Sequence, residues 1–370
     1  MRYKDRIYKK RKTPWLFFVS LTVFIAVMIL LAVAKSSYGA ADLINSTVSR
    51  IYRELMAGFG DIFPFSLFEV VIALIVPTVI LVAVIAAKRF KSGEGRDFIL
   101  LLVSVLLLVY SGHTVALGIG YNTTPIGQRL GISECEVNEE SLLSTLITLR
   151  DEINELSGRI EYTEEGVSSS GTDLDGLSAR ICASYAKLSE TYSFIPKLES
   201  RAKGVYFSEV LSYLSLSGIY TFYTGEANVN TLYPDYDLAF TAAHELAHQR
   251  GILRENEANF MAYFVLISSD DDYLRYSGAL SMYGYVGSAL YRTNPELYYE
   301  ITSSLSDGAR ADMIASSEVY KQYSGTVFED ISSFVNDLFL KSNGTEGVVS
   351  YGMVVKLAVA YHEALNDSKT

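Results

Sequence analysis

Three long, largely apolar stretches dominate the first third of the chain. They cover residues 15–34, 67–87 and 98–118, and each is close to the roughly 20 apolar residues that a helix needs to cross a bilayer. Between the first two, the apolar residues of 36–66 recur every three or four positions. This spacing predicts a short amphipathic helix that lies on the membrane face or packs against the rest of the protein. The pattern therefore predicts three membrane-spanning helices.

Beyond residue 118 the pattern becomes that of a folded, mainly helical domain. Residues 119–133 are rich in glycine and turn formers, which predicts a linker. Leucines at three- and four-residue steps predict two helices within 137–200, interrupted by a glycine- and serine-rich stretch at 166–176. Aromatic and β-branched residues predict strands within 204–232. The expected fold class is mainly α with a small β-sheet (α+β), and residues 119–370 are expected to form one domain.

The distribution of charge predicts the orientation of the chain in the membrane. The first 12 residues carry seven basic side chains and one acidic side chain, and basic residues also gather at 88–97. Cytoplasmic loops carry an excess of Lys and Arg, so we expect both segments in the cytoplasm and residues 119–370 outside it. The residues after 118 hold 35 acidic and 17 basic side chains, which disfavours nucleic acid as a partner.

The strongest chemical signal is the HExxH motif of His244, Glu245 and His248. Residues 240–249 (FTAAHELAHQ) are rich in alanine and lack Gly and Pro, so they predict a helix, and Gly251 predicts its end. Positions i and i+4 share one face of a helix. The two imidazoles can therefore bind one zinc ion while Glu245 reaches the water beside it.

A catalytic zinc ion needs a third protein ligand. A second helix that starts near Arg254 offers Glu255 and Glu257. We favour Glu255, because it shares a face with Asn259, while Glu257 points elsewhere and stays open as the alternative ligand. Asn259 could then hydrogen-bond a ligating histidine and fix the orientation of its ring.

Two resemblances follow from these residues. The segment 255–259 (ENEAN) after HELAHQRG resembles the gluzincin metallopeptidases, whose second helix carries a Glu-x-x-Ala-Asp/Asn pattern. Together with SGIYTFYTGEANVN at 217–230, it also resembles a bacterial family of membrane-anchored proteins called domain of unknown function 3810. The resemblance implies a gluzincin-like zinc site in a protein that is anchored in the bacterial cell membrane. It also implies that TGEANVN supplies an edge strand for a peptide or protein substrate, where Glu226 and Asn228 could contact substrate or serve as turn or helix-capping residues.

Further side chains are weaker candidates for the site. Tyr283, Tyr285 or Tyr351 could donate a hydrogen bond to the oxyanion of a hydrolytic intermediate. His362 lies on an amphipathic C-terminal stretch and could do the same, or could be a capped surface histidine. With 27 tyrosines in the chain, the sequence does not choose among them.

The two cysteines, Cys135 and Cys182, both fall on the expected external side. An oxidising compartment permits a disulfide between them, and two separate buried thiols are the alternative. Their lack of paired spacing makes them poor zinc ligands.

Together these features predict a membrane-anchored, extracytoplasmic zinc metallohydrolase, most simply a peptidase, in which Glu245 is the general base. A zinc-binding but non-catalytic envelope sensor or assembly protein is the alternative, and a scaffold that binds no metal is another. The sequence contains no P-loop and no GxSxG elbow, which sets aside a nucleotide-binding protein and a serine hydrolase.

Overall fold

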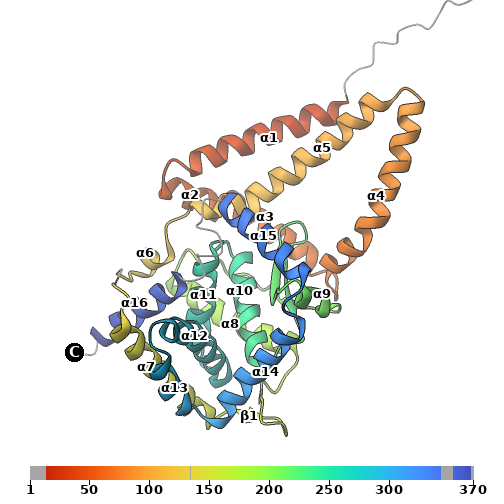
Figure 1. The fold of residues 1–370 in the computed structure, drawn as a ribbon. Helices are drawn as coiled ribbons and strands as arrows, with labels where there is room; N and C mark the ends of the chain where they lie inside the picture. The colour runs from red at the N-terminus through yellow and green to blue at the C-terminus, as the bar shows by residue number, and fades with distance from the viewer. Residues whose placement is uncertain (1–13, 134, 343–352, 368–370) are drawn as a thin grey trace, which may run out of the picture.

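The computed structural model describes residues 14–133, 135–342 and 353–367. Long helices at the N-terminal end project from a mainly helical body (Figure 1). The first part consists of α1 (Trp15–Ala34), α2 (Tyr38–Ile44), the π-helical turn η1 (Asn45–Ser49), α3 (Arg50–Gly60), α4 (Leu67–Lys91), α5 (Gly95–His113) and a second π-helical turn, η2 (Thr114–Gly118).

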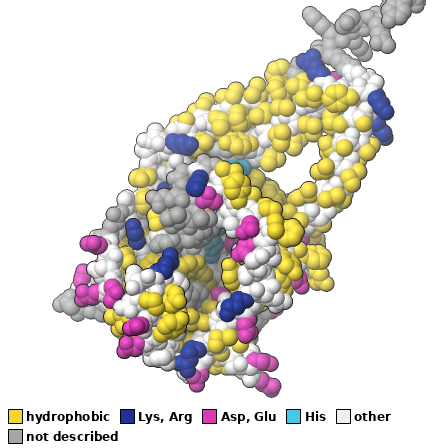
Figure 2. Space-filling view, in the orientation of Figure 1, with side chains coloured by type: hydrophobic (Ala, Val, Ile, Leu, Met, Phe, Trp, Pro, Cys, Tyr) yellow, Lys and Arg dark blue, Asp and Glu magenta, His cyan; other side chains and the backbone are white. Residues whose placement is uncertain are grey.

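Three helices are long and apolar enough to cross a membrane, over Trp15–Ala34, Leu67–Lys91 and Gly95–Asn122. The predicted apolar helices are thus confirmed, and the third continues a few residues further than expected. No residue of α4 is buried, and hydrophobic side chains cover the projecting helices (Figure 2). Such a surface is stable in a bilayer, where a helix satisfies all its backbone hydrogen bonds internally.

The stretch between the first two long helices is amphipathic, with its apolar side outward. Leu43 and Leu55 are each 65% exposed, while Arg53 is 1% exposed. The Arg53 guanidinium donates to Asn45 Oδ1 at 2.9 Å and to the Ala116 carbonyl at 3.2 Å. The segment therefore packs on the protein through its polar side and presents its apolar side to the surroundings.

The body confirms the mainly helical fold class with small sheets. Its elements are η3 (Gly120–Asn122), α6 (Ile126–Leu130), α7 (Glu139–Ser157), β1 (Glu161–Tyr162), β2 (Ser168–Ser169), α8 (Leu174–Thr191), β3 (Ala202–Val205), α9 (Ser208–Tyr213), β4 (Gly218–Thr221), β5 (Glu226–Asn230), α10 (Asp235–Gln249), α11 (Glu255–Ile267), α12 (Asp272–Thr293), α13 (Pro295–Ser303), α14 (Asp307–Tyr323), α15 (Val327–Ser342) and α16 (Met353–Asp367).

Residues 119–133 are not the free linker that the glycine content predicts. They fold into η3 and α6, and Ile119 and Ile126 are buried in the protein interior. The predicted helix pair within 137–200 is present as α7 and α8, and the break between them contains the two-stranded hairpin of β1 and β2.

The larger sheet has the order β3-β5-β4. β5 pairs with β3 in parallel and with β4 antiparallel, so β5 is the central strand. All five residues of β5 are buried, as expected for a strand covered on both faces. This sheet packs beside α10, which carries the HExxH motif.

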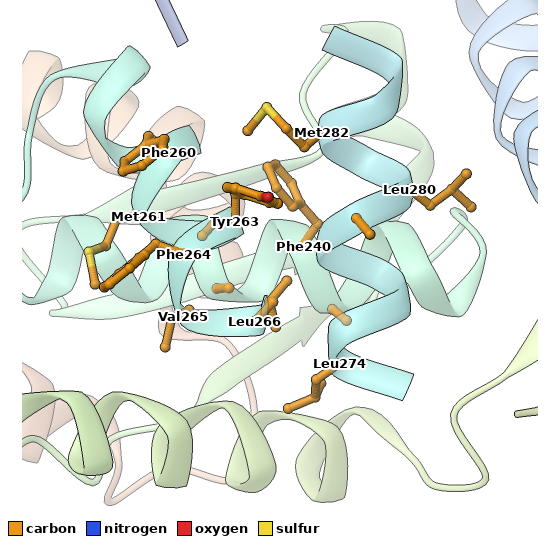
Figure 3. Close-up of a cluster of buried hydrophobic side chains, with 14 of the residues drawn as sticks. Phe240, Phe260, Met261, Tyr263, Phe264, Val265, Leu266, Leu274, Leu280 and Met282 are labelled. Carbon is orange, nitrogen blue, oxygen red and sulfur yellow. The ribbon is translucent and has the colours of Figure 1, made fainter. Parts of the chain in front are cut away.

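The core lies where α10, α11 and α12 meet (Figure 3). Alanines at 239, 242, 243 and 247 have no exposed surface, and their small size lets neighbouring elements approach α10 closely. Every residue of α11 from Asn256 to Leu266 is buried. The two helices that carry the candidate site are therefore fixed at the centre of the body.

Candidate metal centre

α10 holds its two histidines on one face. Asp235 and Asp237 lie in its first turn, where negative charge complements the positive end of the helix dipole. His244 and His248 follow one turn apart, with ring centroids separated by 4.6 Å. Both rings face the start of α11 rather than the core, so the spacing of the motif is realised as predicted.

A tight turn brings α11 back against α10. Gly251 has φ +92°, a conformation that glycine adopts without steric cost, and α11 begins at Glu255. His248 Nδ1 lies 2.9 Å from the Ile252 carbonyl oxygen in this turn. Because a carbonyl only accepts, Nδ1 carries a proton. The neutral form of this ring therefore presents the Nε2 lone pair that a metal ligand requires, whereas the protonated form directs Nε2 at Glu255.

Three potential ligand atoms converge. His244 Nε2 lies 3.3 Å from Glu255 Oε2, and His248 Nε2 lies 3.5 Å from Glu255 Oε1. One ligand atom from each residue lies within 4.8 Å of the others. Ligands placed about 2.0–2.1 Å from a tetrahedral zinc ion are separated by roughly 3.3 Å. The spacing of these residues therefore fits one such ion.

The charges of the cluster also favour a cation. Burial by itself lowers the pKa of His248, but attraction and hydrogen bonding to Glu255 outweigh it and raise that pKa to about 9. Burial raises the pKa of Glu255, but His248 and His244 outweigh it and hold that pKa below its usual range. The buried Glu255 carboxylate thus retains its negative charge because positive charge lies beside it. Either a protonated histidine or a metal ion can supply that positive charge.

Glu245 stands next to the cluster and is not part of it. Its side chain is 5% exposed, and its Oε2 has no hydrogen-bond partner among the described residues. Burial raises the pKa of its carboxyl group, although His244 and His248 act in the opposite direction. A Cβ at Gly218 on β4 would lie 2.7 Å from Glu245 Oε1, so the missing side chain at residue 218 provides the space that this carboxylate occupies.

The structure separates the two candidate third ligands. Glu257 is 6% exposed and accepts hydrogen bonds from Arg254 Nη1 at 2.7 Å and from the Ile126 amide at 3.1 Å. It joins α11 to α6 and does not reach the histidines. Glu257 is therefore neither a member of the cluster nor a solvated surface charge, and Glu255 is the carboxylate that faces both rings.

The predicted hydrogen bond from Asn259 to a histidine is absent. Asn259 is 4% exposed and borders the cavity beside the cluster, but its Nδ2 has no partner among the described residues. His248 instead uses the Ile252 carbonyl, and His244 Nδ1 also has no partner within the described chain. Asn259 therefore offers a buried donor to whatever enters the cavity.

A cavity of about 1210 Å³ opens beside the cluster. It exceeds the roughly 300–1,000 Å³ of ordinary small-molecule pockets, which suits an extended ligand. Its walls include β4, α10, α12 and α14, and Leu117 and Phe339 border it from η2 and α15. The composition of these walls gave no signal in the sequence, because they come from segments far apart in the chain.

Comparison with known proteins gives a family. The family model described as Protein of unknown function (DUF3810) matches residues 42–359. The chain belongs to this family. No curated protein and no solved structure matches it. The matched region includes the His244–His248–Glu255 cluster, the cavity, and the second and third long helices, so these features lie within the part that matches the DUF3810 family model.

In this DUF3810 protein the edge strand beside the cavity is β4, which corrects the expectation that TGEANVN supplies it. TGEANVN forms β5 and the turn before it, and β5 is enclosed between β3 and β4. The Asn230 amide donates to the Ser217 carbonyl. In an antiparallel ladder the bonding alternates, so the peptide groups of Gly218 and Tyr220 face away from β5. Both residues border the cavity.

Glu226 and Asn228 do not border the cavity, which corrects their expected contact with substrate. Glu226 is 2% exposed; it accepts hydrogen bonds from the Leu67 and Phe68 amides at 3.0 Å each and pairs with Lys203 at 2.8 Å. It thus caps the start of α4, the alternative role that the sequence left open. Asn228 is fully buried and accepts a hydrogen bond from the Ser66 hydroxyl.

Of the candidate oxyanion donors, Tyr285 borders the cavity. Tyr283 instead hydrogen-bonds Thr302 at 2.9 Å, away from it. His362 is 6% exposed and lies 2.7 Å from the Tyr263 hydroxyl. It is a core residue between α16 and α11, which corrects both the donor role and the surface role. Tyr351 lies outside the described residues.

The two cysteines are free, so the possible disulfide is not present. Cys182 Sγ donates to the Ser200 carbonyl at 3.3 Å, and Arg250 contacts the same sulfur. Cys135 has Glu363 of α16 as a neighbour, and burial raises the pKa of its thiol. The alternative of two separate thiols is the correct one, and both are partly buried.

Proposed function

We propose that the chain is a membrane-anchored zinc metallohydrolase that cleaves peptide bonds outside the cytoplasm. The observation that carries the proposal is the convergence of His244 Nε2, His248 Nε2 and the Glu255 carboxylate, with the Glu245 carboxylate adjacent. Two histidines one helical turn apart and a glutamate from the following helix also match the gluzincin pattern that the sequence resembles.

His244, His248 and Glu255 would hold the zinc ion, leaving a position open toward the cavity. When bound there, zinc supplies Lewis acidity to the reaction. Glu245 would accept the proton of the attacking water and deliver it to the leaving amine, because its buried carboxylate lies beside the cluster and its Oε2 has no hydrogen-bond partner among the described residues. Tyr285 and the buried Asn259 amide are the donors that could stabilise developing negative charge.

An extended peptide would pair with β4. The outward amide and carbonyl of Gly218 and the Tyr220 carbonyl would supply main-chain hydrogen bonds, as in other cases where a peptide adds a strand to a sheet edge. The Tyr220 amide is directed at Glu245 instead. The same edge runs beside Glu245, so the paired substrate passes the reacting groups. The positive-inside distribution of basic residues supports placing this cavity outside the cytoplasm.

Zinc content tests the metal assignment. The full chain, purified in detergent, is expected to hold one zinc ion per molecule by elemental analysis. Glu255→Gln removes a direct ligand. Loss of a residue that only hydrogen-bonds a ligand weakens metal affinity by about 10- to 100-fold, so we expect this variant to weaken zinc affinity by more than about 100-fold. Glu257→Gln is the matched control, since it lies on the same helix turn and should retain zinc. Equal zinc loss in both variants, or no zinc in the wild type, contradicts the assignment.

Peptide-library digestion tests the chemistry. Glu245→Gln keeps the shape of the side chain and removes the base, so we expect zinc content to persist while cleavage falls by about 10²–10⁴-fold. Zinc without any cleavage by the wild type would instead favour the non-catalytic sensor or assembly protein. Cleavage that survives Glu245→Gln would exclude Glu245 as the base.

A further inference from the structure

α15 has an apolar face that none of the described residues covers. The residues of this face recur at helical spacing, are all exposed by more than half, and are Val327, Phe328, Ile331, Phe334, Val335 and Leu338. The opposite side packs inward, where Leu340 is fully buried and Asn336 and Phe339 border the cavity. Soluble proteins rarely leave a contiguous apolar patch of this kind without a partner.

Contacts fix α15 at the level where the long helices end. The Phe339 ring lies 5.8 Å from the His113 ring, at the last residue of α5, and 6.3 Å from the Tyr121 ring just beyond it. In Figure 1, α15 reaches the end of α5. Hydrophobic side chains over α15 lie on the same side of the molecule as those of the projecting helices (Figure 2).

A second exposed apolar segment lies at the start of α4. Tyr206 is 85% exposed and Phe207 is 59% exposed, and the Phe207 amide donates to Glu69 Oε1 in the first turn of α4 at 2.8 Å. The following helix, α9, is joined to the start of α15, because Thr326 Oγ1 donates to the Tyr213 carbonyl at 3.3 Å. Two apolar surfaces are thus tied to two ends of the long helices.

We propose that α15 and the 206–213 segment are docked in the interfacial layer of the bilayer. The surface is continuous with helices that themselves require lipid, and an amphipathic helix buries its apolar face at the boundary of headgroups and acyl chains. α15 carries Glu329, Asp330 and Asp337 against the single Lys341. Attraction to anionic lipid therefore does not drive the docking, and neutral phosphatidylcholine is sufficient.

This docking has a consequence for the cavity. The inner side of α15 borders the cavity, so one wall of the cavity is a helix held by lipid. Ligands reach the cluster next to the membrane surface, which favours polypeptide segments that are anchored in the same bilayer. The last point rests on the proposed function, whereas the docking itself does not.

The test uses the full chain in phosphatidylcholine nanodiscs that hold one protein molecule. Both native cysteines are first replaced, by Cys135→Ser and Cys182→Ser, and a single new cysteine then carries an environment-sensitive fluorophore. Phe334→Cys and Leu338→Cys report on α15. Tyr299→Cys on α13 is the control. Tyr299 is a large side chain with 60% exposure, the same as Leu338, but it has no contact with the long helices. We expect nitroxide-labelled lipid to quench the α15 probes severalfold more than the α13 probe, and aqueous iodide to show the reverse order.

Two outcomes overturn the proposal. Quenching of the α15 probes by iodide to the same extent as the α13 probe would mean that the face is in water. Protection of the α15 probes from both quenchers would mean that protein covers it. Two independent positions on α15 guard against one poorly folded variant, and neither readout depends on zinc or on cleavage, so failure of the proposed function leaves this test intact.

Discussion

At the scale of single residues, Asp237 is an unfavourably placed acid in the wall of the cavity. It lies in the first turn of α10, where the helix dipole favours its charge. Burial nevertheless raises its pKa to about 6, with a contribution from Asp312, against hydrogen bonds from Ser316 and Tyr236 that lower it. Its Oδ2 has no hydrogen-bond partner among the described residues. Strained acids of this kind often mark functional surfaces.

Asp237→Asn is therefore expected to stabilise the protein at neutral pH. The pKa of about 6 in the folded state exceeds the ordinary value of 3.8, so the wild type loses stability as pH rises from about 4 to about 6 and the variant does not. The gain is about 1–3 kcal/mol above pH 7 and vanishes below about pH 4. Unfolding midpoints at both pH values measure it. Asp307→Asn, at a side chain that is 98% exposed, should show no such dependence, and an equal gain at both pH values would refute the explanation.

The site residues differ in how far they could be predicted, and the reason is the sequence distance to their partners. His244, Glu245, His248 and Glu255 lie on two consecutive helices, so helical spacing and one short connecting turn bring them together. Glu226 instead meets the Leu67 and Phe68 amides, 159 and 158 residues away. No local pattern contains that information, and its role as a cap was visible only as one alternative.

At the scale of elements, the connection between α10 and α11 sets the position of Glu255. Gly251 has φ +92°, and a Cβ there would fall 2.3 Å from Arg53 Nη2. Its carbonyl accepts a hydrogen bond from Asn45 Nδ2 at 3.2 Å. The turn therefore depends on a residue without a side chain for two reasons, backbone conformation and close approach of the α2–α3 segment.

Gly251→Ala is expected to cost about 2–4 kcal/mol of folding stability, the sum of left-handed strain and a collision with a buried guanidinium. It should also weaken metal binding, because the start of α11 must shift. Gly131→Ala is the matched control, since Gly131 has φ +70° but open space around its Cβ. That variant should lose only about 1–2 kcal/mol and retain metal. Thermal unfolding and zinc titration of both variants distinguish strain from collision; equal effects would show that Arg53 does not constrain the turn.

Helices and strands were unequally predictable for a related reason. The end of α10, the start of α11 and the pair α7 and α8 follow from periodicity and capping within each segment. The order β3-β5-β4 places a later strand between two earlier ones. Strand order depends on contacts between segments, so no local pattern could identify β4 rather than β5 as the edge beside the cluster.

At the scale of the whole molecule, several polar junctions among the described residues join the long helices to the body, and two of them are central. In one, Arg53 and Asn45 meet Ala116 and the Gly251 carbonyl. In the other, Glu226 caps α4 while Lys203 donates to the Gly60 and Phe63 carbonyls. The spans themselves follow from hydropathy, whereas these junctions do not. They hold the body at a fixed position against the ends of the spans.

This arrangement makes the orientation in the membrane measurable. The basic residues at the junction of α4 and α5 are Lys88, Arg89 and Lys91 in the last turn of α4 and Arg96 in the first turn of α5. The body lies at the opposite ends of these helices. Because translocating such a basic junction is disfavoured, the junction should face the cytoplasm and the body the outside. With both native cysteines replaced by serine, a membrane-impermeant maleimide added to intact cells should label Asp307→Cys and spare the exposed Ser92→Cys. Permeabilised cells should label both. Labelling of residue 92 alone in intact cells would place the His244–His248–Glu255 cluster in the cytoplasm and exclude the proposed extracytoplasmic role.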